Sequence, residues 1–213
     1  MLEKTMIILG GGGHAKVVLD ALNYSEDVSV RGIIDNNLPK GEKLYGIPVI
    51  GSDEELEKFY DEGIEWIFIG IGFITDSQEQ QRRVEMLESI GFQFPMIMHP
   101  TAVVAEDVDI DEGTFVAPSV TINPGTRIGA HCIINTGVTI DHDCAIGDFV
   151  HLSPGVTLSG GVYVEDHSFI GVGSNVAHGV NIGSNVIVGA GSTVIKDILE
   201  PGTYVGSPVR KIK

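Results

Sequence analysis

Aliphatic side chains recur at every sixth residue through the second half of the chain. The series is Val104, Ile110, Val116, Ile122, Ile128, Ile134, Ile140, Ile146, Leu152, Leu158, Val164, Ile170, Val176, Ile182, Val188 and Val194. A second column, four residues later, runs from Val108 to Ile198 and holds only small or β-branched residues. A helix needs a hydrophobic period near 3.6 and a half-buried strand a period of 2, so a period of six indicates short strands separated by turns. We therefore expect a hexapeptide β-helix with both columns pointing inward.

The fourth position of each hexad supports this interpretation, because it holds residues that form turns. They are Gly113, Gly125, Gly137, Gly155, Gly161, Gly173, Gly179, Gly191 and Asn185, with Asp107, Asp143 and Asp197. Such residues suit a corner at which the backbone needs a positive φ. Three hexads then make one coil of ~18 residues, and about five coils stack at the ~4.8 Å spacing of neighbouring strands. A sandwich of short strands would instead show a period of 2 and irregular turns.

The first half of the chain begins with a strand, a glycine turn and a helix. An apolar run at 5–9 leads into Gly10–Gly13 and His14, after which the apolar residues have helical spacing. Glycines allow a ligand to approach the backbone, and a helix N-terminus offers free N–H groups to an anion. A second strand, 30–34, ends in Asp35 and Asn36. An acidic residue at that place is typical of a mononucleotide-binding unit, where it reaches a ribose hydroxyl.

Strand and helix patterns continue to alternate up to residue 98. We expect strands at 47–50, 65–70 and 92–98, a helix that Ser52 caps, and an amphipathic helix at 77–90. This order predicts a small Rossmann-like parallel sheet with its ligand at the carboxyl ends of the strands, near Gly70 and Gly72, although these two glycines also suit a plain tight turn. The domains are therefore an α/β domain at 1–98 and a β-helix with a C-terminal tail at 99–213.

The composition indicates which partners the protein is expected to bind and in which cellular compartment it is expected to occur. The formal net charge of −16 disfavours nucleic acid as a partner, although small anions can still bind to local amides and cations. No apolar run reaches the ~20 residues of a membrane span, so we expect a cytoplasmic protein that does not bind membranes. Cys132 and Cys144 lie in the inward column, where reduced thiols act as compact apolar fillers.

Five histidines of the repeat lie outside both inward columns, which places them at the surface or at an interface. They are His131, His142, His151, His167 and His178. Histidines of this kind could bind zinc, as in the β-helix carbonic anhydrases, but the H-x-x-x-x-H spacing of that family is absent, so no metal is expected. His142 lies between two aspartates at a corner, where a carboxylate can fix the imidazole tautomer and raise its basicity. It is either a general base or an exposed turn residue.

The chain resembles the hexapeptide-repeat sugar acetyltransferases of the sialic acid O-acetyltransferase and UDP-N-acetylbacillosamine N-acetyltransferase type. The motifs that carry this resemblance are GGGGHAKV at 10–17, Asp35, HPTAVV at 99–104, NTGVTIDHDCAIGDFVHLSPG at 135–155 and GSPVRKI at 206–212. The resemblance implies a left-handed parallel β-helix and a homotrimer in which acetyl-CoA lies between adjacent β-helices. It also implies that the N-terminal domain binds the nucleotide-sugar acceptor.

The resemblance also implies roles for single residues. His142 matches the general base and Asp143 its carboxylate partner. The acetyl-CoA positions are His151, Gly160, Val172 and Ala190, and the acceptor positions are Gly12, Gly13, His14, Asp35, Asn36, Gly72 and Asn135. Some relatives that act on UDP-amino sugars carry two aspartates where this chain has Asp35 and Asn36, so the nucleotide stays open.

These observations predict direct acetyl transfer from acetyl-CoA to the amine of a nucleotide-activated amino sugar of the UDP-4-amino-sugar type. O-acetylation of a sialic acid is the alternative enzyme activity. A non-catalytic trimeric scaffold that binds a nucleotide is the alternative of another class. A nicotinamide-dependent dehydrogenase would need more than the ~100 residues of the first domain, because a dinucleotide normally spans two mononucleotide-binding halves.

Overall fold

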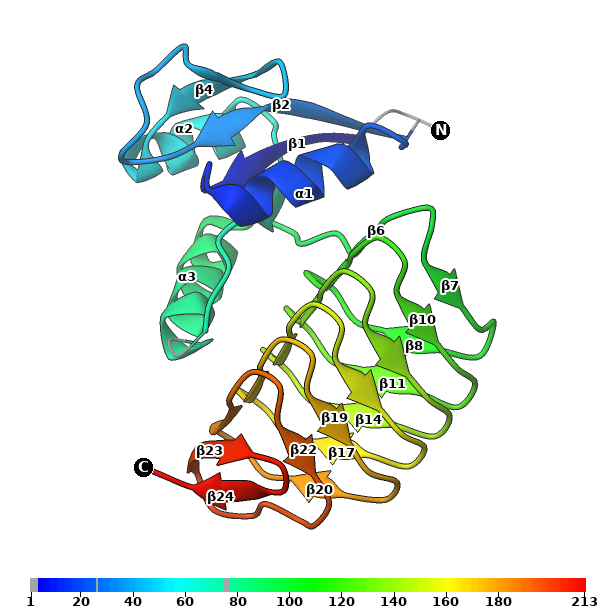
Figure 1. The fold of residues 1–213 in the computed structure, drawn as a ribbon. Helices are drawn as coiled ribbons and strands as arrows, with labels where there is room; N and C mark the ends of the chain where they lie inside the picture. The colour runs from blue at the N-terminus through cyan, green and yellow to red at the C-terminus, as the bar shows by residue number, and fades with distance from the viewer. Residues whose placement is uncertain (1–3, 26, 75–76) are drawn as a thin grey trace. The chain divides into compact units, whose positions relative to one another are not determined.

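The computed structural model describes residues 4–25, 27–74 and 77–213. The chain forms two compact units (Figure 1). The first comprises Met1–Gly72 and Gln81–Ile97, and the second comprises Phe73–Gln80 and Met98–Lys213. Phe73–Gln80 therefore packs with the second unit, although it precedes the expected boundary at 98 and 99. Among the described residues, no helix has the length and apolar character needed to cross a membrane.

The first unit is a five-stranded sheet with strand order β3-β4-β2-β1-β5. Its elements are β1 (Lys4–Leu9), α1 (Gly13–Leu22), β2 (Val28–Ile34), β3 (Lys43–Leu44), β4 (Ile47–Gly51), the 3₁₀ turn η1 (Asp53–Glu55), α2 (Leu56–Asp61) and β5 (Trp66–Ile69). Most of α3 (Ser77–Ile90) also belongs to this unit, whereas its start, up to Gln80, belongs to the second. Strands β4, β2, β1 and β5 are parallel, and β3 adds an antiparallel edge. The predicted Rossmann-like α/β sheet is confirmed.

The predicted strand at 92–98 is wrong as a member of this sheet. Only Gln93 makes a bridge there, to Trp66. The last residues of the run form β6 (Ile97–Met98), which extends a sheet of the β-helix. The apolar residues of the run are nevertheless buried, because Phe92 and Phe94 are only 4% and 3% exposed. The hydrophobic pattern of this segment reflects its burial, and burial does not require the continuous hydrogen-bond ladder of a strand.

The second unit is a left-handed parallel β-helix, whose stacked coils are visible in Figure 1. One face is a six-stranded sheet of β7 (Val103–Val104), β10 (Thr121–Ile122), β13 (Thr139–Ile140), β16 (Thr157–Leu158), β19 (Asn175–Val176) and β22 (Thr193–Val194). The second is a five-stranded sheet of β8 (Asp109–Ile110), β11 (Arg127–Ile128), β14 (Ala145–Ile146), β17 (Tyr163–Val164) and β20 (Asn181–Ile182). The third is an eight-stranded sheet that contains β6, β9 (Phe115–Val116), β12 (Ile133–Ile134), β15 (His151–Leu152), β18 (Phe169–Ile170) and β21 (Val186–Val188), then β23 (Gly202–Gly206) and β24 (Val209–Lys211).

Both predicted inward columns form the core of the β-helix. From Val116 to Val194 every member of the first column is at most 4% exposed, and from Thr114 to Ile198 the same holds for the second column. The buried polar members also bond to the neighbouring coil, as where the Thr126 hydroxyl donates to the carbonyl of Asp141. Hydrophobic burial therefore repeats at every hexad, three times per coil, and the buried polar groups are satisfied between coils. The two cysteines are free buried thiols, and burial raises the pKa of Cys132 to about 12.

Positive φ values mark the corners of the coils, as the turn residues predicted. The eight glycines of the fourth hexad position, Asn185 and Asp143 all have φ between +57° and +76°. The predicted turn residues Asp107 and Asp197 do not have positive φ; their carboxylates instead accept hydrogen bonds from the backbone N–H groups of Gly125 and Asn181. Ser119, His131, Phe149 and His167 occupy the same hexad position and adopt the same left-handed conformation, although none of them is glycine, asparagine or aspartate.

Candidate active site

His142 and Asp143 lie on the corner between β13 and β14. The Nδ1–H of His142 donates to Oδ2 of Asp143 across 2.8 Å, which leaves Nε2 as a proton acceptor. On the other side, the backbone N–H of His142 donates to Oδ1 of Asp141 at 2.8 Å. The imidazole is 53% exposed and is therefore accessible to a substrate. The hydrogen bond to Asp143 fixes one tautomer and orientation of the imidazole, as a general base would require.

The charges at this corner favour the protonated form of His142. The hydrogen bond to Asp143 raises the pKa of His142 above its usual value, and the negative charge of Asp141 adds to this effect. The pKa of Asp141 itself is lowered, first by the hydrogen bond from the side chain of Asn123. Asp141 therefore stays ionised over a wider pH range, while the raised pKa lets the His142 imidazole take up a proton more readily.

Gly160 lies on the next coil, directly beside the imidazole of His142. A Cβ atom at Gly160 would stand 2.6 Å from Nε2 of His142, closer than real side chains approach. The absence of a side chain thus gives the imidazole its position over the backbone of the following coil. His178 occupies the same corner position one coil further on, and its ring centroid lies 6.3 Å from that of His142.

His151 lies in a different environment, on the outer face of β15. Its Nδ1–H donates to the carbonyl of Phe73 at 2.6 Å, and its Nε2 faces the side-chain amide of Asn135 at 3.3 Å. The ring makes edge contacts with Phe73 and Phe169 and is 8% exposed, and this burial lowers the pKa of His151. His151 lies outside both inward columns, as predicted, but it is buried because Phe73, which packs with the β-helix, covers its ring.

A single chain does not bring all the predicted acetyl-CoA residues together. Val172 and Ala190 lie on successive coils at the corner where strands of the six-stranded sheet begin, and Asn135 is on the same side. His142 and Gly160 lie at the corner where strands of that sheet end. The two groups are therefore separated by the width of one face of the β-helix.

His131 and His167 also lie outside the inward columns, and they form a stack with a phenylalanine. Their rings stack on the two sides of Phe149, with centroids 5.1 and 5.3 Å away and nearly parallel planes. His131 is 8% exposed, and burial lowers its pKa to about 4. The ladder of rings therefore removes His131 from water, although it lies outside both inward columns.

The first unit contains a hollow of about 570 Å³ at the N-terminus of α1. It is lined by Gly10, Gly11, Gly12, Gly13, His14, Asp35, Asn37, Gly70, Ile71, Gly72 and Arg83. Gly10 has φ +93°, which turns the chain from β1 into the loop. The hollow lies at the carboxyl ends of β1, β2 and β5, where parallel α/β sheets bind their ligands.

Two of the predicted acceptor residues have structural partners. Oδ2 of Asp35 accepts the N–H of Gly11 at 2.8 Å, so this carboxylate fastens the glycine loop to the end of β2. A carboxylate retains further lone pairs for a ligand hydroxyl. Asn36 exchanges two hydrogen bonds with Asp53 and does not line the hollow.

Asn37 and Arg83 line the hollow and were missed by the sequence analysis. Asn37 directly follows the Asp35–Asn36 pair, so its proximity to the ligand-binding edge was available from the sequence. Arg83 lies on α3, fourteen residues of mostly polar sequence, and only the packing of this helix shows which polar side chain faces the loop. Its cationic side chain suits a ligand that carries negative charge.

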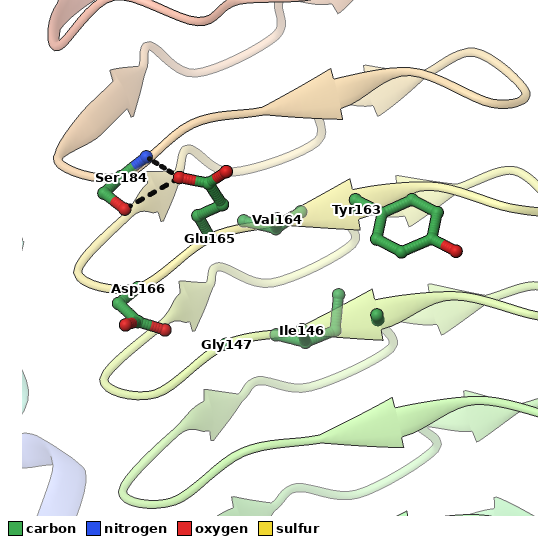
Figure 2. A pocket seen from close by; sticks show the side chains of 8 residues that line it. Ile146, Gly147, Tyr163, Val164, Glu165, Asp166 and Ser184 are labelled. Carbon is green, nitrogen blue, oxygen red and sulfur yellow. Dashed lines mark hydrogen bonds between the residues drawn. The ribbon is translucent and has the colours of Figure 1, made fainter.

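A second hollow, on the face of the five-stranded sheet, has a different character (Figure 2). Two of its eight lining residues are acidic, but the carboxylate of Glu165 accepts hydrogen bonds from the N–H and the hydroxyl of Ser184 at 3.1 and 2.9 Å. Asp166 likewise accepts the N–H of Asp148. These carboxylates join successive coils. Within the described ranges, no three His, Cys, Asp or Glu side chains are grouped to hold a metal ion.

Comparison with known proteins agrees with this architecture. Residues 5–87 match the PglD N-terminal domain, and 125–160 and 161–196 match the bacterial transferase hexapeptide repeats. A structure of a perosamine N-acetyltransferase variant from Caulobacter crescentus, in complex with CoA and GDP-perosamine, superposes with a TM-score of 0.91. It shares 36% sequence identity, and the match covers 98% of this chain and 97% of that chain. The chain belongs to the hexapeptide-repeat sugar acetyltransferase family.

Two further proteins are also similar to this chain. The acetyltransferase domain of PglB from Neisseria gonorrhoeae, in complex with acetyl coenzyme A, has a TM-score of 0.87 and 29% identity, with 99% and 100% of the two chains covered. The UDP-N-acetylbacillosamine N-acetyltransferase of Bacillus subtilis is 35% identical over 119 residues. That alignment spans 53% of this chain and 51%, about half, of the curated relative.

Proposed function

We propose that this protein is an acetyl-CoA-dependent N-acetyltransferase whose acceptor is the amine of a nucleotide-activated amino sugar. The observation that carries the proposal is the hydrogen-bonded pair of His142 and Asp143, with Nε2 of His142 held beside Gly160. Two of the similar structures bind CoA together with GDP-perosamine, and another binds acetyl coenzyme A. An oriented base and a nucleotide-sized hollow are the two features such a reaction needs.

In the proposed reaction, the acceptor amine attacks the thioester carbon directly, without an acyl-enzyme. Nε2 of His142 takes a proton from the amine as the C–N bond forms, and the proton ends on the sulfur of the departing CoA thiolate. Asp143 fixes the tautomer and stabilises the imidazolium during the transfer. Asp143 therefore acts through His142 and needs no contact with the substrate.

The nucleotide part of the acceptor is assigned to the hollow at the N-terminus of α1. Free N–H groups at that helix end and the side chain of Arg83 favour the phosphates, and Asp35 retains capacity to accept a ribose hydroxyl. We keep a UDP-4-amino sugar as the expected acceptor type, with a GDP-4-amino sugar as the alternative that the Caulobacter crescentus complex suggests.

We further propose a homotrimer in which acetyl-CoA lies between neighbouring β-helices. The separation of the two groups of predicted residues supports this assembly. A neighbour could present the corner with Val172 and Ala190 to the corner with His142, and cyclic symmetry would repeat that site three times. Light scattering coupled to size exclusion should give about three times the 22.7 kDa chain mass.

Turnover assays test the activity. Wild-type protein and acetyl-CoA are incubated with a UDP-4-amino sugar, GDP-perosamine or free sialic acid, and release of the CoA thiol is followed. We expect turnover with a nucleotide-activated amine. Activity with sialic acid alone would replace the proposal by O-acetylation. Absence of acetyl-CoA binding at millimolar concentration would favour the non-catalytic scaffold.

Mixing inactive chains tests the shared site. A His142→Ala chain mixed with an Ala190→Trp chain should recover about a quarter of wild-type activity, because that share of interfaces combines two intact corners in randomly mixed trimers. A chain that carries both substitutions is the matched control. Mixed with either single variant it should restore no activity, because no interface then combines an intact His142 corner with an intact Ala190 corner. No recovery in a mixture proven to contain hybrid trimers would contradict a shared site.

A further inference from the structure

We propose that His178 is a second catalytic base of this reaction, which takes the proton that the ammonium form of the acceptor must lose before the amine can attack. The inference rests on the proposed function. It assigns different protons to two histidines: His178 accepts the first from the ammonium group, and His142 accepts the second during C–N bond formation.

The geometry places both imidazoles at the same corner of the β-helix. His142, Gly160 and His178 occupy the same corner on three successive coils. Gly160 contributes no side chain, so the ring of His142 extends over it toward the following coil, and the ring centroids lie 6.3 Å apart with their planes inclined by 46°. A single substrate nitrogen fits between rings at this separation within the ~2.6–3.2 Å reach of a catalytic hydrogen bond to each.

His178 is also free to act on a ligand. Its side chain is exposed, and it makes no hydrogen bond to another residue in the described part of the chain. Its ring passes over Gly161, where even a Cβ atom would remain 3.8 Å from Cε1, so the corner leaves open space on this side. This arrangement contrasts with His151, whose two ring nitrogens already face protein groups.

The chemistry of an aliphatic amine creates the need for two acceptors. Such an amine is protonated near neutral pH, as the reference pKa of about 10.4 for lysine illustrates, and an ammonium group has no lone pair for attack. One proton must leave before attack and a second must leave as the amide forms. The second ends on the CoA thiolate, and the first is released from His178 to solvent, so the sum is ammonium plus acetyl-CoA giving amide, CoA thiol and one free proton.

The charges around the pair suit an ammonium group. Asp141 interacts electrostatically with both His142 and His178, and Asp143 is hydrogen-bonded to His142. Lys196 holds the equivalent corner position one coil after His178, and the carboxylate of Asp197 accepts the N–H of Asn181. The carboxylates of Asp141 and Asp143 therefore favour binding of the acceptor in its ammonium form. Because the bound ammonium group cannot attack, it must lose a proton on the enzyme.

The test is the pH dependence of kcat/KM for GDP-perosamine or the UDP-4-amino sugar, whichever the wild type acetylates, in His178→Asn and His178→Gln. We expect a loss of about 10- to 100-fold at pH 6.5, at the low end of general-base effects. The loss should vanish above the pKa of the acceptor amine, which an NMR titration of the free sugar measures. His142→Asn should instead stay impaired at every pH.

His167→Asn is the matched control, because it removes an imidazole from another corner of the same β-helix. Its profile should coincide with that of the wild type. Equal activity of wild type and both His178 variants at pH 6.5 would overturn the assignment, as would a loss of the same size at all pH values. If the wild type acetylated no amine at all, the proposed function would fail instead, so the two failures are distinguishable.

Discussion

Two histidine environments on one β-helix show how the same side chain acquires opposite properties. At the corner after β13, His142 is exposed and bonded to Asp143, and its pKa is raised. On the neighbouring face and corner, His151 and His131 are buried by aromatic rings, and their pKa values are lowered. Carboxylates make an imidazole a better base, whereas loss of water makes it a neutral structural group. The repeat supplies equivalent backbone positions, and the neighbours decide the chemistry.

Of the substitutions at the exposed and the buried histidines, replacement of the exposed His142 should have the largest effect on activity. His142→Ala removes the proposed base and should lower kcat by about 10²- to 10⁴-fold, because a positioned base contributes that much. The melting temperature should change little, since the side chain is half exposed. Steady-state kinetics and equilibrium dialysis with acetyl-CoA measure the two effects. Full turnover by this variant would remove His142 from the mechanism.

The buried histidine of the ring ladder should control acid stability instead. The folded-state pKa of His131 is about 4, below the usual value of 6.5. Above pH 6.5 both folded and unfolded states hold it neutral, and no stability is lost. Between pH 6.5 and 4 only the unfolded state takes up the proton, so the chain loses up to about 3 kcal/mol from this group.

Replacing that histidine by phenylalanine tests the sign of the effect. His131→Phe keeps a ring against Phe149, which itself adopts the same left-handed backbone conformation. The melting temperature of the variant should fall less than that of the wild type between pH 7.5 and 5. His178→Phe, at an exposed position, is the control and should follow the wild type. An unchanged acid response of the His131 variant would contradict the assigned burial effect.

The buried histidine that anchors Phe73 should matter mainly for stability. His151→Asn removes the hydrogen bond to the carbonyl of Phe73 and the edge contacts with two phenylalanine rings. The free energy of unfolding should fall by about 1–3 kcal/mol, as for a buried acceptor that loses its partner. Chemical denaturation measures this change. If stability stayed the same and only the KM for acetyl-CoA rose, His151 would be a ligand contact, as the family resemblance implies.

The smallest effect should come from neutralising the carboxylate beside the exposed base. Asp143→Asn weakens the interaction that raises the pKa of His142. The acidic limb of the kcat/KM profile should move to lower pH, and kcat on the plateau should fall about tenfold because the tautomer is held less firmly. A pH profile that is lower but not displaced would show that Asp143 orients the base without tuning it.

The pattern of residues was sufficient for the fold of the second half. Inward columns at every sixth position and glycines at corners determine a coil independently of distant contacts, because each coil packs only on its neighbours. The same locality allowed the bonded pair of His142 and Asp143 to be predicted, since the two are adjacent in sequence. The glycine loop and Asp35 were predictable for a related reason: each follows directly from the end of a strand.

Contacts between distant segments could not be obtained in this way. The strand at 92–98 was mispredicted because hydrophobicity reports burial and not which sheet supplies the hydrogen bonds. The burial of His151 depends on Phe73, 78 residues earlier, and the place of Arg83 at the hollow depends on how α3 packs. The sequence thus determined which local units form, whereas the tertiary structure decided which side chains lose water, and with it which histidines have a lowered pKa.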